Sequence, residues 1–482
     1  MNDRDDEGHP TGAGPKTDGD APLPSKNPAD GDAVRPSVRG VWAPAYPLLI
    51  AGLTQITLNV VDTVMLARLS TRALSAFALA APVYLIALIV VRGWATAVQV
   101  RVAQCHGAGR PDEVARVARA GTVTAVAAGA VVGAVLFVAA TPVLTLLGAE
   151  DDLIGPGTAY LRVLAFAVPV AAVSFTLQAA CAGIGATRVS MYTALLANAV
   201  NLPLGLLLIF GTGLGVTGAA LATLAATAAG TGYLLAYSRP RLLRRPADTG
   251  GTGGDSREIT RGLWRIGWPE MSTLGVGYLN EAALAGFAAR MGTHDLAAYR
   301  IVDNLLLVVF TVLASGASAV TVLAGQELGR GDPVRARAWG RAGTRLTLLV
   351  FALPAVAVLA VGGPLISAVT DDPAVAELAW EAIPLALLSM APMVLAMPLG
   401  ALLRAAGDTR SVMIASITSD YVLLIPFGWL LGVHLGLGLP GLYTAWTSFA
   451  VCYAALLLLR YRRRFPGATA PAPRPGPGRS PT

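Results

Sequence analysis

Apolar segments of about 20 residues, the length needed to cross a bilayer, recur along almost the whole chain. We predict twelve such spans, six between residues 43 and 238 and six between residues 263 and 460. Of the 482 residues, 54% are hydrophobic and only 13% are charged, which is about half the charged share of a soluble domain. The sequence therefore predicts an all-α polytopic membrane protein with twelve transmembrane helices.

The arginines indicate how these spans are oriented. Most of them follow the even-numbered spans, as in the cluster between Arg239 and Arg245, whereas two loops on the opposite side are acidic (148–152 and 370–372). The positive-inside rule then places both termini and the central linker in the cytoplasm. Low-complexity composition predicts disordered cytoplasmic tails at 1–40 and 465–482, and a cytoplasmic linker is expected at 239–262.

The two halves of the chain repeat one another at a constant offset. Seven pairs of identical residues lie 222 positions apart: Pro47 and Pro269, Arg68 and Arg290, Gly109 and Gly331, Gly121 and Gly343, Gly185 and Gly407, Arg188 and Arg410, Met191 and Met413. Each half holds six spans, so both halves have the same orientation and should be related by an axis along the membrane normal. We predict two pseudo-symmetric six-helix lobes, a first lobe at 41–238 and a second lobe at 263–464.

A polar stripe interrupts the first span. Gln55, Asn59 and Asp62 follow one another at i, i+4 and i+7, a spacing that places them on one helical face. One interpretation is structural: a hydrogen-bonded seam between helices, or a salt bridge from Asp62 to Arg92 or Arg162. The other is a face that lines a water-filled cavity, because a carboxylate in hydrocarbon costs several kcal/mol and marks a substrate or ion pathway.

The repeat extends this polar pattern to other spans. Asn198 and Asn201 lie three residues apart in the fifth span, where they either bind helices together or line the same cavity. At the 222-residue offset, Asn59 corresponds to Glu281 and Asn198 corresponds to Asp420. Two carboxylates that share an apolar cavity suit the binding and release of a proton. We therefore predict that Glu281 and Asp420 form an acidic pair in the second lobe.

Six segments of the chain resemble one transporter family. They are NVVDTVMLARLS (59–70), VAQCHGAGRPDE (102–113), GIGATR (183–188), NAVNLPLGLLLIFG (198–211), LGVTGAALAT (214–223) and LLRAAGDTR (402–410). In this order and spacing they are similar to the multidrug and toxic compound extrusion (MATE) transporters over about residues 41–464. The resemblance implies a multi-pass protein of the plasma membrane, with two six-helix bundles around a central cavity, that exports drugs in exchange for H⁺ or Na⁺.

The resemblance also implies roles for single residues. The family's first-span aspartate falls on Asp62, and the asparagine and threonine of one branch's cation site fall on Asn201 and Thr223. A Na⁺ ion would then bind at Asp62 and Asn201. A seventh-span glutamate of other members falls on Glu281, whereas Gly205 stands where the first branch has a second aspartate. The sequence leaves the choice between H⁺ and Na⁺ open.

These observations predict a cation-coupled antiporter, not an enzyme, that exports amphipathic, cationic drugs or metabolites. We expect it to act as a monomer, with a small-molecule substrate, H⁺ or Na⁺ and the bilayer as partners, and with no cofactor, nucleic acid or further metal. The predicted cation-coupling residues are Asp62, Asn201, Thr223, Glu281 and Asp420, and the predicted cavity and substrate residues are Gln55, Asn59, Asn198 and Tyr278.

Two alternatives stay open. A lipid-linked-precursor flippase of the same superfamily would need a more basic cavity, for which Arg92 and Arg162 are the mid-span candidates. A membrane-embedded transferase would need the aspartate pairs at 151–152 and 371–372 to hold a Mg²⁺-diphosphate. An ATP-driven pump is disfavoured, because the chain contains no GxxxxGK[ST] phosphate-binding loop.

Overall fold

The computed structural model describes residues 35–243, 256–367, 370 and 372–466, and every regular element among them is helical. Most of the predicted tails and half of the predicted linker (1–34, 244–255 and 467–482), together with Asp371, lie outside the described residues. Helices nevertheless begin inside both predicted polar segments, at Val38 and at Ser256.

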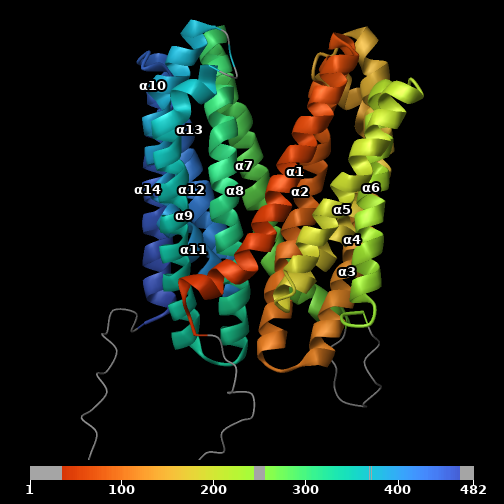
Figure 1. The fold of residues 1–482 in the computed structure, drawn as a ribbon. Helices are drawn as coiled ribbons and strands as arrows, with labels where there is room; N and C mark the ends of the chain where they lie inside the picture. The colour runs from red at the N-terminus through yellow and green to blue at the C-terminus, as the bar shows by residue number, and fades with distance from the viewer. Residues whose placement is uncertain (1–34, 244–255, 368–369, 371, 467–482) are drawn as a thin grey trace, which may run out of the picture. The chain divides into compact units, whose positions relative to one another are not determined.

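The helices fall into two consecutive sets (Figure 1). The first lobe consists of α1 (Val38–Leu69), α2 (Thr71–Gly107), α3 (Pro111–Leu146), α4 (Asp151–Gly183), α5 (Arg188–Leu206), the π-helical segment η2 (Leu207–Gly211) and α6 (Gly215–Ser238). The second lobe consists of α7 (Ser256–Met291), α8 (Thr293–Gly329), α9 (Pro333–Ser367), α10 (Pro373–Met390), α11 (Met393–Ala405), α12 (Thr409–Ser419), η3 (Asp420–Leu424), α13 (Ile425–Phe427), η4 (Gly428–His434) and α14 (Gly438–Arg464).

Eleven segments of the described residues are long and apolar enough to cross a membrane, which confirms the polytopic helical fold. The tenth predicted span is divided between α10 and α11, because the chain turns at Ala391 and Pro392. The predicted span that is missing from the eleven is α7 (Ser256–Met291). It is 36 residues long, but Glu270 and Glu281 make it more polar than α1, its counterpart in the repeat.

The repeat predicted from the sequence is present in the backbone. Gly109 and Gly331 end the turns after α2 and α8 with φ of 69° and 78°, a left-handed conformation that glycine adopts without strain. Gly185 and Gly407 do the same after α4 and α11, with φ of 87° and 75°. Both lobes therefore use the same turns at the same places.

The first helix of each lobe begins within the core of the other lobe. Val41 and Ala45 of α1 are buried in a cluster with Trp339 of α9, and Leu263 and Ile266 of α7 are buried in the core of the first lobe. A proline then follows in each helix, Pro47 in α1 and Pro269 in α7; proline removes a helical hydrogen bond and favours a bend. Figure 1 shows the first part of α1 inclined to the rest of the helix.

Four turns lie together at one end of the bundle, here called the basic end. They are the turns after α2, α4, α8 and α11 (107–111, 183–188, 329–333 and 405–410), and an arginine lies in or at the end of each (Arg110, Arg188, Arg330 and Arg410). At the opposite end, Arg72 of α2 bonds Asp152 of α4, with Nε and Oδ2 3.4 Å apart. In the second lobe His294 Nε2 lies 3.4 Å from Asp372 Oδ2. Both contacts join the start of the lobe's second helix to its fourth span.

Candidate functional site

Asp62 lies in the last third of α1 (Val38–Leu69) and is the central residue of the candidate site. Its side chain is buried, with the residue only 6% exposed, and no hydrogen-bond or ion-pair partner for it is present among the described residues. The two arginines considered as partners lie elsewhere: Arg92 stacks 4.9 Å from the centre of the Phe175 ring, and Arg162 stacks 5.3 Å from that of Phe137. The interpretation of Asp62 as one half of a structural ion pair with these arginines is therefore wrong.

Asn201 and Thr223 form a polar contact at a similar depth to this carboxylate. Asn201 is 1% exposed, and its Nδ2 donates a hydrogen bond to Thr223 Oγ1 over 3.4 Å. A Cβ on Gly205, one turn after Asn201, would lie 3.5 Å from the sulfur of Met65, one turn after Asp62. The helices α1 and α5 run in the same direction. Asp62 lies one turn before Met65, and Asn201 lies one turn before Gly205, so Asp62 and Asn201 lie at the same level along the two helices.

The side chain of Asn198 is hydrogen-bonded to a neighbouring helix. Its Nδ2 donates to the backbone oxygen of Thr54 on α1, 3.0 Å away, and more weakly to Ala194. An interhelical hydrogen bond of this kind joins transmembrane helices. Of the two interpretations of Asn198, the structure supports helix binding.

The other predicted cavity residues are exposed. Gln55 and Asn59 of α1 and Tyr278 of α7 are all exposed, Tyr278 to 41%. Amide side chains that are exposed at mid-span depth are costly in hydrocarbon but not in water. Their positions are consistent with a wetted face of α1 and α7.

Glu281 belongs to a polar cluster of the second lobe. Tyr299 of α8 donates its hydroxyl to Glu281 Oε1 over 3.2 Å, and Arg300 Nη1 lies 3.6 Å from the same oxygen. Tyr299 stacks in turn on Tyr443 of α14, with ring centres 6.5 Å apart. Glu281 is thus tied to α8, and sequence reasoning missed Tyr299 because no local pattern marks it.

Asp420 has different partners from Glu281. It is buried at the first residue of the π-helical segment η3, where it accepts a hydrogen bond from Ser416 Oγ over 3.3 Å. Asn280, the residue before Glu281, is its neighbour on α7. Adjacent residues of a helix point about 100° apart, so the side chains of Asn280 and Glu281 lead to different neighbours, and the predicted pairing of Glu281 with Asp420 is not seen in their contacts.

A cation would have oxygen ligands available in the first lobe. The Asp62 carboxylate, the Asn201 amide and the Thr223 hydroxyl all carry oxygen atoms, which hard cations prefer. Within the described ranges, no three His, Cys, Asp or Glu side chains gather as ligands for a metal ion. The chemistry of this site is therefore that of one carboxylate with neutral oxygen donors.

A symmetric pair of glutamines joins the lobes at the basic end, and sequence reasoning missed it. Gln104 of α2 donates Nε2 to the backbone oxygen of Ala405 over 2.7 Å. Gln326 of α8 donates Nε2 to the backbone oxygen of Gly183 over 2.9 Å. Both donors and both acceptors are 222 residues apart. We call these two hydrogen bonds the glutamine clasp.

Two glycines let α2 and α8 meet inside the clasp. A Cβ on Gly107 would overlap the backbone carbonyl of Gln326, and a Cβ on Gly329 would overlap that of Gln104. These positions are again 222 residues apart. The backbones of α2 and α8 are in direct contact here, so the two lobes are closed against each other at the basic end.

A buried ion pair fixes α7 to the second lobe near this end. Arg404 Nε of α11 lies 2.8 Å from Glu270 Oε1 of α7, and both residues are largely buried. Arg404 lies in the last turn of α11. Removal of one partner of such a pair costs about 3–5 kcal/mol, so this contact is structural.

Comparisons with known proteins agree with the fold. The family model described as MatE matches residues 47–207 and 276–430. A MOP superfamily transporter from Pyrococcus furiosus is 17% identical, with a TM-score of 0.83 over 89% of this chain and 96% of that chain. A MATE transporter mutant from Vibrio cholerae is 19% identical, with a TM-score of 0.82 over the same shares of the two chains. An outward-facing multidrug resistance MATE family transporter is 18% identical, with a TM-score of 0.83 over 89% of this chain and 96% of its own.

Proposed function

Because this chain belongs to the MatE family of membrane transporters, we propose that it is an antiporter that exports amphipathic cations in exchange for H⁺ or Na⁺. The observation that carries this proposal is the buried Asp62 carboxylate, which has no ionic partner among the described residues. An unpaired charge at this depth is costly. A bound H⁺ or Na⁺ would neutralise it in one part of the transport cycle.

The exchange follows from competition for negative charge. With the cation bound at Asp62, beside Asn201 and Thr223, the site is neutral and holds a cationic substrate weakly. Once the cation leaves, the free carboxylate attracts the substrate, since opposite charges interact strongly in a low dielectric. Arrival of the next cation from outside then favours release of the substrate. Glu281, held by Tyr299, would give the second lobe a carboxylate with the same effect.

The proposed orientation has the basic end in the cytoplasm. The arginine-bearing turns after α2, α4, α8 and α11 support this assignment, because positive loops stay on the cytoplasmic side. Both termini would then be cytoplasmic, and the protein would lie in the plasma membrane as a monomer. The basic end is closed in this structure, so substrate would have to enter from the cytoplasm after the glutamine clasp opens.

Opening the clasp is energetically accessible. Two neutral hydrogen bonds together stabilise the closed arrangement by about 1–3 kcal/mol. This is similar to the free-energy difference of a few kcal/mol that separates two interconverting conformations of a protein. The bonds of Gln104 and Gln326 are related by the repeat, so they would break together when the lobes rotate apart. The proposed cycle therefore alternates between this arrangement and one that is open at the basic end.

The alternative functions have less support. Two of the four aspartates that a transferase would use have other partners: Asp152 pairs with Arg72, and Asp372 caps α10 by accepting a hydrogen bond from the Ala374 amide. A flippase for lipid-linked precursors would need cationic groups for phosphates, and the mid-span arginines lie over aromatic rings.

Efflux from everted membrane vesicles tests the proposal. Ethidium is used as the probe, and a pH gradient and a Na⁺ gradient are imposed separately. We expect one of these gradients to drive ethidium transport in vesicles that contain the chain, and vesicles without the chain to show none. Transport that responds to neither gradient would refute cation coupling.

A further inference from the structure

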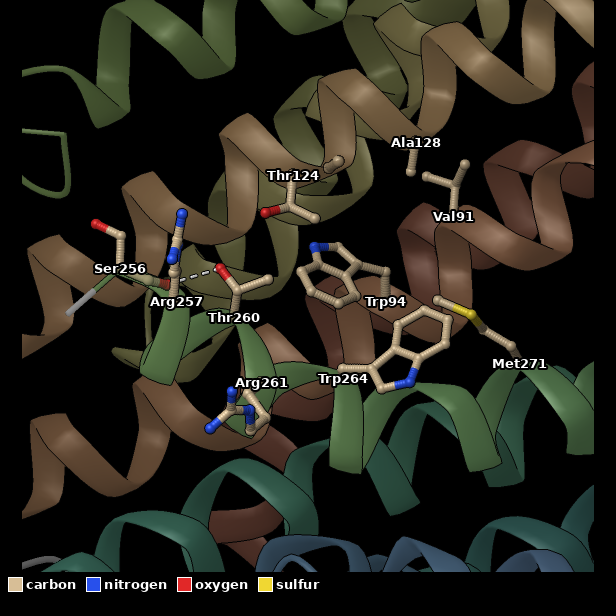
Figure 2. Close-up of a pocket in the computed structure, with 11 residues that line it drawn as sticks. Val91, Trp94, Thr124, Ala128, Ser256, Arg257, Thr260, Arg261, Trp264 and Met271 are labelled. Carbon is tan, nitrogen blue, oxygen red and sulfur yellow. Dashed lines mark hydrogen bonds between the residues drawn. The ribbon is translucent and has the colours of Figure 1, made fainter. Parts of the chain in front are cut away.

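A groove of about 590 Å³ lies between α2, α3 and the first turns of α7. Figure 2 shows that the residues that line it are basic and polar at one end and apolar at the other. Arg257, Thr260 and Arg261 lie at one end, and Ala128 and Met271 lie at the other. The groove is open on one side, since Trp264 at its middle is 56% exposed.

The walls of this groove are fixed. Trp94 donates its indole N–H to the backbone oxygen of Gly121 over 2.9 Å, and it is buried. The Thr260 hydroxyl donates to the backbone oxygen of Ser256 over 2.8 Å (Figure 2). Trp94 and Thr260 therefore keep one orientation, and the order of cationic, indole and aliphatic groups along the groove is a stable feature.

The repeat contains a counterpart of this groove that is filled. Residues 35–42 (RPSVRGVW) match residues 257–264 (REITRGLW) at the offset of 222. The counterpart lies beside Trp42, between α1, α8 and α9, and its volume is about 10 Å³. A Cβ on Gly40 would lie 2.7 Å from the ring of Trp339, whereas Gly262 has nothing within 4 Å.

Three side chains contribute to the difference, although Gly316 of the filled counterpart stands where the open groove has the larger Trp94. Trp339 stands where the first lobe has Val117, and it packs against α1. Leu346 and Val350 of the filled counterpart stand where the open groove has Thr124 and Ala128. The groove is therefore a property of the first lobe and not a by-product of the repeated fold.

We propose that this groove binds one anionic phospholipid of the cytoplasmic leaflet, which rests on the orientation given under the proposed function. Arg257 and Arg261 would contact the phosphate, and an acyl chain would lie along Ala128 and Met271. No aspartate or glutamate is among the residues that line the groove in the described part of the chain. Basic pockets between helices on the cytoplasmic side recognise anionic headgroups, and tryptophan favours the membrane interface.

The bound lipid would join the two halves of the protein. The groove takes α2 and α3 from the first lobe and α7 from the second, and α7 carries Glu281. An occupied groove would hold the first turns of α7 against the first lobe. Lipid composition would thereby affect the helix that supplies the second-lobe carboxylate.

Native mass spectrometry of the full chain, titrated with phosphatidylglycerol or phosphatidylcholine of equal chain length, tests this proposal. Two arginines should make the Kd for phosphatidylglycerol about 30-fold lower, and Arg261→Gln should remove about five-fold of that preference. Arg39→Gln is the matched control, because Arg39 occupies the same place beside the filled counterpart, and it should keep the full preference.

A filling variant gives an independent readout. Thr124→Leu combined with Ala128→Val introduces the residues of the filled counterpart, and it should weaken binding of both lipids. Equal affinity of the wild-type chain for both lipids would show a non-selective apolar groove and overturn the proposal. So would equal behaviour of the Arg261 and Arg39 variants. The titration does not involve transport, so its failure is distinct from a failure of antiport.

Discussion

A methyl group at the contact between α2 and α8 should open the basic end of the protein. Gly107→Ala places a Cβ where the backbone carbonyl of Gln326 lies in the closed arrangement. Neither side can relax by a rotamer change, because the overlap is with backbone, and forced overpacking of this kind costs about 1–3 kcal/mol. The clash exists only while the lobes touch, so the ratio of open to closed molecules should rise roughly 5- to 150-fold.

Distances between spin labels can measure this ratio. Asp112 and Val334 are exposed, equivalent positions in the first turns of α3 and α9, and cysteines placed there would report the separation of the lobes in a background without the three native cysteines. We expect Gly107→Ala to shift the distribution toward longer distances. Gly232→Ala is the matched control, because nothing lies within 4 Å of that helical position. A distribution for Gly107→Ala identical to that of the wild type would refute the reasoning.

Three further predictions concern other contacts. Asn198→Ala should lower the free energy of unfolding by about 0.6–2 kcal/mol and leave cation-driven efflux in place, because Asn198 binds α5 to α1. Loss of cation-driven efflux with an unchanged free energy of unfolding would contradict this. Glu281→Gln and Asp420→Asn should have additive effects on efflux, because their partners differ, whereas strong non-additivity would favour the acidic pair. Burial raises the pKa of Asp408, but hydrogen bonds, chiefly from Arg460, outweigh it and lower that pKa below its ordinary 3.8. The charged Asp408 therefore stabilises the fold above its ordinary pKa, and this stabilisation is lost as pH falls through the lowered pKa. The melting temperature of the wild type should decline below about pH 4, and that of Arg460→Gln should decline much less.

Local patterns predict the helices and the repeat well, because both depend on the chain itself. Apolar length marks a span whatever its neighbours are, and a constant offset marks matching places in two lobes. Asn201 and Thr223, aligned through family resemblance, do meet in the structure. Hydropathy does not identify α7 as a span. Its Glu270 forms an ion pair with a buried arginine of another helix, and a hydropathy window does not detect such a partner.

Contacts between lobes are less accessible from the sequence. Gln104 and Gln326 obey the offset and stand beside the arginine-bearing turns, so the repeat did contain a signal for them. Their acceptors are backbone oxygens of Gly183 and Ala405, which any residue type could supply. The partner of each glutamine therefore depends on how the lobes pack, and side-chain identity alone does not reveal it. The same reason explains why Asp420 meets Asn280 and not Glu281.

The response of efflux to an imposed cation gradient in Asp62→Asn tests the central claim most directly. The substitution keeps the shape of the side chain and removes its charge, so the folded protein and its insertion into proteoliposomes should be unchanged. We expect the gradient that accelerates ethidium efflux in the wild type to have no effect on the variant. Acceleration equal to that of the wild type would contradict a coupling role for the buried carboxylate of α1.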